Sequence, residues 1–116
     1  MIVIVDYGLG NLASVKNMLK KIGFDSMISK DRNEILNASL IILPGVGSFD
    51  HGVQNLQNYN LIEPLNTFAL DYKKPVIGIC LGMQLMCTSS EEGDLKGLSW
   101  FDTKVTKFSF SNNSIK

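Results

Sequence analysis

The residues with the clearest chemical potential surround Cys80. Segment 76–84 runs Val-Ile-Gly-Ile-Cys-Leu-Gly-Met-Gln, so an apolar stretch leads into Gly-x-Cys-x-Gly. Glycines two residues on either side of a nucleophile let a strand and the following helix pack closely around a cramped turn. Such a turn directs the sulfur to the carboxyl end of a sheet, where open α/β sheets bind ligands. The pattern predicts a thiol that attacks a carbonyl carbon; the alternative is a buried cysteine between two packing glycines.

Two backbone regions are candidates to stabilise the oxyanion that such an attack creates. The N–H of Leu81 directly follows the cysteine, and the helix N-terminus there favours negative charge. A second donor near Val46 and Gly47 belongs to the Pro-Gly-Val-Gly loop at 44–47, which follows an apolar run. Glycine-rich loops in this position present N–H groups to anions. An ordinary turn is the alternative, whereas the spacing does not match Gly-x-x-x-x-Gly-Lys and excludes a Walker phosphate loop.

A third glycine motif lies near the N-terminus. Segment 6–11 is Asp-Tyr-Gly-Leu-Gly-Asn, and Ala13 stands where a dinucleotide fingerprint would have its third glycine. No acidic residue clearly closes the second predicted strand, which argues against dinucleotide binding. A flavodoxin-like domain that binds a nucleotide or flavin stays open as an alternative.

The elements that must position these residues alternate between strand and helix. Buried strands are predicted at 2–5, 24–29, 40–43 and 76–79. Helices are predicted at 11–22, 31–36, 50–56, 61–72 and 81–87. This alternation favours one α/β domain over residues 1–116, with a parallel sheet and right-handed crossovers. Segment 103–110 alternates polar and apolar residues, which predicts an edge or antiparallel strand with one wet face.

Composition excludes several other classes of protein. Eleven basic and 11 acidic residues give no net charge, so nucleic acid is not an expected partner. No apolar run reaches the roughly 20 residues of a membrane span, and the N-terminus does not resemble a signal peptide, so we expect a cytoplasmic protein. Two cysteines and one histidine argue against a structural metal site. If Cys80 and Cys87 share one helix, they lie about 10 Å apart, too far for a disulfide.

Taken together, these motifs resemble the class I, triad-type glutamine amidotransferases. The resemblance is strongest to the glutaminase subunits of imidazole glycerol phosphate synthase. Asp-Tyr-Gly-x-Gly-Asn, Pro-Gly-Val-Gly-x-Phe and Gly-Ile-Cys-Leu-Gly-Met-Gln stand in order at 6–11, 44–49 and 78–84, and Ser-Glu-Glu-Gly follows at 90–93. The resemblance extends from residue 1 to about 110 and implies a flavodoxin-like parallel-sheet fold, incomplete at its carboxyl end.

The resemblance also implies a role for each matching residue. Cys80 would attack the side-chain amide of glutamine, form a thioester and release ammonia. The remaining site residues are three oxyanion donors, two glutamine contacts and one partner contact: Val46, Gly47 and Leu81; Gln84 and Glu92; and Asn11. The implied partner is a (β/α)₈ cyclase subunit that uses the ammonia to make imidazole glycerol phosphate in histidine biosynthesis, and no cofactor is implied.

One part of the family pattern is missing. The family has a His-x-Glu pair near its C-terminus, whereas the single histidine here, His51, is followed two residues later by Val53. We therefore interpret the sequence as an N-terminal portion, truncated before that pair and catalytically incompetent at this length. An open sheet edge and apolar face should make it poorly soluble or oligomeric. Two alternatives stay open: a non-catalytic module that docks on a cyclase-like partner, and a glutaminase that serves surface-sugar amidination.

Overall fold

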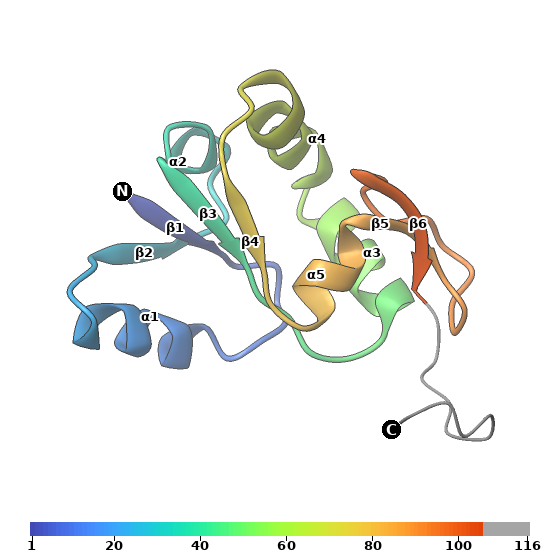
Figure 1. The fold of residues 1–116 in the computed structure, drawn as a ribbon, viewed down its shortest axis with the longest axis horizontal. Helices are drawn as coiled ribbons and strands as arrows, with labels where there is room; N and C mark the ends of the chain where they lie inside the picture. The colour runs from blue at the N-terminus through green and yellow to red at the C-terminus, as the bar shows by residue number, and fades with distance from the viewer. Residues whose placement is uncertain (106–116) are drawn as a thin grey trace, which may run out of the picture.

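A four-stranded parallel sheet forms the centre of the computed structural model, which describes residues 1–105 (Figure 1). The strands follow the order β2-β1-β3-β4 across the sheet. Their bounds are Ile2–Val5 for β1, Ser26–Ser29 for β2, Leu40–Leu43 for β3 and Val76–Gly78 for β4. The predicted α/β fold with a parallel sheet is confirmed, although β2 begins later and β4 ends earlier than the apolar runs indicated.

Short helices cover both faces of this sheet. They are α1 (Leu12–Lys21), α2 (Arg32–Leu36), α3 (Phe49–Asn58), α4 (Ile62–Asn66), its π-helical continuation η1 (Thr67–Asp71), and α5 (Leu81–Leu85). Helix α1 lies on one face, and α2 and α4 lie on the other (Figure 1). Three helix starts are fixed by side-chain caps, from Asn11, Asp31 and Ser48. None of the described helices is long and apolar enough to cross a bilayer.

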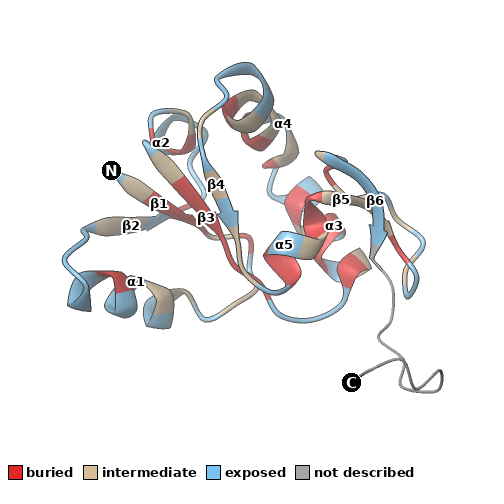
Figure 2. Cartoon of the chain, viewed as in Figure 1, coloured by how far each residue is buried: buried red, intermediate tan, exposed pale blue. Residues whose placement is uncertain are grey.

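The two faces of the sheet are buried to different extents. The larger core lies on the side of α2, α3 and α4, and a smaller one joins Leu19 of α1 to the opposite face. On that α1 face the strand register aligns Ile28, Ile4, Ile42 and Ile77 in one row across all four strands. The inner two are buried, but Ile28 and Ile77 are 37% and 48% exposed. Helix α1 packs against β2 and β1 on this face and lies away from β4 (Figure 2).

The predicted helix at 81–87 is too long at its C-terminal end. Helix α5 ends at Leu85, and Cys87 instead begins strand β5 (Cys87–Ser90). The backbone N–H groups of Leu98, Phe101 and Ser99 donate to the carbonyls of Leu85, Met86 and Cys87, so a returning loop binds the carbonyls that a longer helix would have used. The distance argument against a disulfide rested on one shared helix and fails, although both cysteines are free.

The predicted edge or antiparallel strand at 103–110 is an edge strand among the described residues, but it is not antiparallel and it begins earlier, at Phe101. Strand β6 (Phe101–Val105) pairs in parallel with β5 in a separate two-stranded sheet. After β5 the chain returns to the start of that strand, where the N–H of Gly97 donates to Thr88 O, before β6 begins. A side chain at position 97 would overlap the Cys87 carbonyl, so glycine permits this close return. Within residues 1–105 both strands are edges, and residues 106–110 of the predicted strand lie outside this described part of the chain.

Candidate active site

Cys80 occupies the turn between β4 and α5. Its backbone has φ 55° and ψ −120°, in the left-handed half of conformational space that residues other than glycine seldom adopt. Such conformations persist only where the surrounding structure enforces them, and they are concentrated at functional sites. Cys80 is a free, exposed cysteine, so the alternative of a buried structural cysteine is wrong. The turn has the geometry of a nucleophile that is presented to substrate.

The glycines on either side of Cys80 make this turn possible. A Cβ at Gly78 would lie 2.6 Å from Cα of Met83, and a Cβ at Gly82 would overlap the carbonyl oxygen of Leu43. In both cases the obstacle is backbone, which cannot rotate out of the way. The strand and the helix therefore approach closely only because both positions lack a side chain, as the spacing predicted.

The loop at 44–47 lies directly against the start of α5. Tyr7 is fully buried, and its hydroxyl donates a hydrogen bond to the carbonyl of Pro44. Burial raises the pKa of this hydroxyl, so it stays a donor. A Cβ at Gly45 would overlap the Tyr7 hydroxyl and lie 3.1 Å from Cβ of Leu81. Tyr7 therefore fixes Pro44 and Gly45, the first half of the loop, from the buried side. Tyr7 is not among the predicted site residues, although it follows a buried strand and belongs to the first glycine motif.

The predicted oxyanion donors are arranged unequally. Val46 is 61% exposed and Gly47 has φ 111°, so this half of the loop is open to solvent. The N–H of Leu81 donates to the Gly45 carbonyl, with 3.2 Å between nitrogen and oxygen. This amide therefore already has an acceptor within the protein. It becomes available to a substrate oxygen only if the Gly45 carbonyl turns away.

A hollow of about 310 Å³ brings three of the predicted site residues together. Asn11, Val46 and Cys80 all line it, and its walls come from the start of α1, the loop after β3 and the end of β4. A Cβ at Gly10 would lie 3.2 Å from N of Gly45, so the first glycine motif serves close packing here. No histidine, aspartate or glutamate of the described residues lines this hollow.

Gln84 and Glu92 are predicted glutamine contacts, and neither lines this hollow. Gln84 lies one turn beyond Cys80, with its backbone nitrogen 3.3 Å from the Cys80 carbonyl oxygen. Glu92 lies in the loop after β5, is exposed, and donates its N–H to Ser90 Oγ at 3.2 Å. His51 is exposed on α3, where its N–H donates to the cap Ser48. The structure therefore brings Asn11, Val46 and Cys80 together at one hollow, whereas Gln84 and Glu92 lie outside it.

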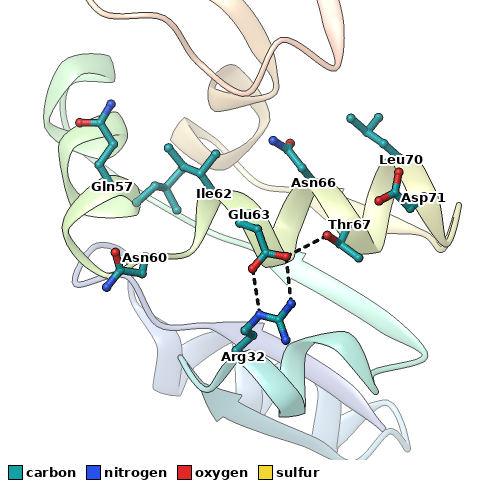
Figure 3. A pocket seen from close by; sticks show the side chains of 10 residues that line it. Arg32, Gln57, Asn60, Ile62, Glu63, Asn66, Thr67, Leu70 and Asp71 are labelled. Atoms are coloured by element: carbon teal, nitrogen blue, oxygen red, sulfur yellow. Dashed lines mark hydrogen bonds and ion pairs between the residues drawn. The ribbon is translucent and has the colours of Figure 1, made fainter.

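A larger hollow of about 690 Å³ lies beside α2, α3 and α4 and contains none of the predicted site residues (Figure 3). Two of its charged side chains bind each other: Arg32 Nε and Nη2 lie 2.8 Å and 3.0 Å from the two carboxylate oxygens of Glu63. Thr67 Oγ1 adds a third hydrogen bond to that carboxylate, at 3.0 Å. The larger hollow therefore does not coincide with the predicted site, because Cys80 lines the smaller one.

Comparisons with known proteins show the family to which the chain belongs. A family model described as "Glutamine amidotransferase class-I" matches residues 3–113. The chain is 54% identical over 112 residues to the "Imidazole glycerol phosphate synthase subunit HisH 2" of Methanococcus maripaludis, covering 97% of this chain and 55% of that protein. It is 46% identical over 108 residues to the protein of the same name in Pseudomonas aeruginosa, covering 93% and 54%. The chain thus spans about half the length of the curated relatives it matches.

The fold has a counterpart among solved structures. A crystal structure of a glutamine amidotransferase superposes with a TM-score of 0.75 at 16% identity, covering 91% of this chain and 56% of that one. This similarity supports the fold alone, whereas the family model covers nearly all residues of the chain. The resemblance inferred from the three motifs is confirmed: the chain belongs to the class I glutamine amidotransferase family.

Proposed function

We propose that this chain carries the nucleophile of a glutaminase that supplies ammonia for the synthesis of imidazole glycerol phosphate. The observation that carries the proposal is the exposed Cys80 in a strained turn beside the 44–47 loop. The relatives' names support histidine biosynthesis over the surface-sugar alternative. The proposal includes a (β/α)₈ cyclase partner contacted near Asn11 and a cytoplasmic location.

In the proposed reaction, the Cys80 sulfur attacks the side-chain amide carbon of glutamine and forms a tetrahedral oxyanion. The carbon–nitrogen bond then breaks, the nitrogen takes a proton and leaves as ammonia, and a thioester remains. Water hydrolyses the thioester to glutamate and restores the thiol. Binding of glutamine through Gln84 and Glu92 would hold the amide carbon within reach of the sulfur.

The oxyanion in this scheme needs donors at Val46, Gly47 and Leu81. The Leu81 amide is occupied by the Gly45 carbonyl, so we propose that the 45–46 peptide must reorient before this donor serves the reaction. Gly45 and Gly47 flank the exposed Val46, and Gly47 has free space around it, so the loop can move on this side. Tyr7 would hold Pro44 in place during that movement.

Turnover also needs a group that moves protons. Because no histidine or carboxylate of the described residues lines the hollow beside Cys80, we propose that the base comes from outside residues 1–105. The thiol should then react with an electrophile but release little ammonia from glutamine. Steady ammonia release from the 116-residue chain with a cyclase partner present would contradict this expectation.

The site is tested by labelling the chain with a diazoketone analogue of glutamine and mapping the adduct by mass spectrometry. We expect one adduct, on Cys80, and slower labelling when glutamine competes. Cys80→Ser should abolish the adduct, whereas Cys87→Ser is the matched control and should label like the wild type. Equal labelling of Cys80 and Cys87, or no labelling of either cysteine, would contradict the proposed function.

A second candidate function is a non-catalytic module that docks on a cyclase-like subunit. The observation in its favour is the occupied Leu81 amide, together with a hollow whose described lining carries no base. Binding to a cyclase subunit without labelling of Cys80 would favour this module over the glutaminase. If the chain does not bind a cyclase subunit at micromolar concentration, this second candidate function is wrong.

A further inference from the structure

Asp50 connects two segments of the site that are far apart in the sequence. It lies in the first turn of α3, and its carboxylate accepts hydrogen bonds from the backbone of the loop that follows β5. The N–H of Asp94 lies 3.1 Å and 2.9 Å from the two carboxylate oxygens, and the N–H of Leu95 lies 2.9 Å from Oδ1. A side chain at Gly93 would overlap Asp50 Oδ1, so the loop is built to approach this carboxylate closely.

The helix that carries Asp50 also contacts the other parts of the site. Only Ser48 and Phe49 separate Asp50 from the 44–47 loop. Helix α3 packs directly on α5, because a Cβ at Gly52 would lie 3.0 Å from Leu85 and 3.2 Å from Leu81. Asp50 therefore fixes the loop that carries Glu92 to the same rigid element that supports the oxyanion loop and the helix after Cys80.

We propose that Asp50 is a positioning residue for glutamine, because its carboxylate holds loop 91–95 where Glu92 can meet the substrate. This inference rests on the proposed function. Charge-assisted hydrogen bonds from two adjacent backbone N–H groups suit such a task, because they fix a loop in direction as well as distance. The carboxylate of Glu92 is itself a suitable acceptor for the α-ammonium group of an amino-acid substrate.

The inference predicts a defect in substrate binding with little change in the chemical step. Saturation kinetics of labelling by the diazoketone analogue give a half-saturating concentration and a limiting rate for each variant of the full chain. We expect Asp50→Ala to raise the half-saturating concentration about tenfold. The limiting rate should stay within about twofold of the wild type. Asp50→Asn keeps one acceptor oxygen and should give an intermediate value.

A matched control separates this role from general destabilisation. Asp31 also accepts a backbone hydrogen bond, because its carboxylate caps α2 by accepting from the N–H of Glu34 at 3.0 Å, but it lines neither hollow. Asp31→Ala should lower the melting temperature and leave both labelling constants unchanged. In a Glu92→Ala background, Asp50→Ala should cause no further increase, because the two residues act on the same contact.

The possible results distinguish a failure of the role inferred for Asp50 from a failure of the proposed function. An unchanged half-saturating concentration for Asp50→Ala, or an equal rise for Asp31→Ala, overturns the inference while the proposed function stands. Wild-type labelling that neither saturates nor slows with glutamine overturns both. If Asp50→Ala does not melt cooperatively, Asp50→Asn decides, because it preserves side-chain volume: a raised half-saturating concentration supports the positioning role, and a wild-type value overturns it.

Discussion

Single glycine residues decide whether the turn at Cys80 can form at all. Gly82→Ala should destabilise the fold by about 3 kcal/mol, because the new Cβ would overlap the Leu43 carbonyl and the backbone there cannot move aside. Chemical denaturation measures the loss in the free energy of unfolding. Gly23→Ala is the control, because a Cβ at position 23 would meet no neighbouring atom. The only strain is the φ of 97°, so this variant should lower the free energy of unfolding by about 1 kcal/mol. Equal losses for the two variants would contradict the steric explanation.

Tyr7 offers a second test at the residue scale. Tyr7→Phe keeps the buried ring but removes the hydrogen bond to Pro44 O, and a buried carbonyl without its donor should cost about 1–2 kcal/mol. Tyr72→Phe alters an exposed ring and should change stability by less than about 0.5 kcal/mol. Thermal melts of the two variants compare them directly.

The same residue predicts a dependence on alkaline pH. Burial raises the pKa of Tyr7 in the folded state above its ordinary value. The unfolded chain therefore ionises first, and the stability that Tyr7 contributes is complete below its ordinary pKa of about 10 and is lost as the pH rises through the folded pKa. Tyr7→Phe should be less sensitive to alkali than the wild type. If the wild type and Tyr7→Phe lose the same free energy of unfolding at alkaline pH, other groups cause the alkaline loss of stability.

Between elements, the Arg32–Glu63 pair joins α2 to α4. The hydrogen bond from Arg32 is the main cause that lowers the pKa of the Glu63 carboxyl. The stability that this pair contributes is therefore present above the ordinary pKa of glutamate. It is lost as the pH falls through the lowered pKa of Glu63 in the folded state. Because both side chains are exposed, Glu63→Gln should cause only a small loss at neutral pH, one that shrinks in acid and in high salt. The matched control is Asp71→Asn, because Asp71 lines the same hollow and takes no part in the Arg32–Glu63 hydrogen bonds.

Elements were predictable from sequence where their pattern is local. The strand at 40–43 and the cap at Asp31 follow from apolar runs and capping residues, and the structure has both. The end of α5 was not predictable, because Leu85 and Met86 continue a helical apolar pattern while a loop from 98–101 takes their carbonyls. The tie from Asp50 to residues 94 and 95 was equally hidden, since it joins positions more than 40 residues apart through backbone groups that no side-chain pattern reveals.

At the scale of the whole molecule, the α1 face of the sheet is the feature with the largest consequence. Parallel sheets are normally covered on both faces, and β4 is also an edge whose outer backbone groups have no neighbouring strand among the described residues. Ile77 stands on that strand at 48% exposure. We expect the chain to self-associate at micromolar concentration through this surface, and Ile77→Lys should reduce the association, as measured by sedimentation velocity.

The opposite edge of the sheet supplies the matched control for that expectation. Ile28 belongs to the same row of isoleucines, is 37% exposed, and lies on the other edge strand, β2. If association uses the β4 edge, Ile28→Lys should leave the sedimentation profile close to that of the wild type. Equal effects of the two lysines would show that contact through the apolar face as a whole drives association. A wild-type chain that stays a cooperatively melting monomer would refute the expectation, because the exposed isoleucines at the two ends of the row would then carry no penalty in water.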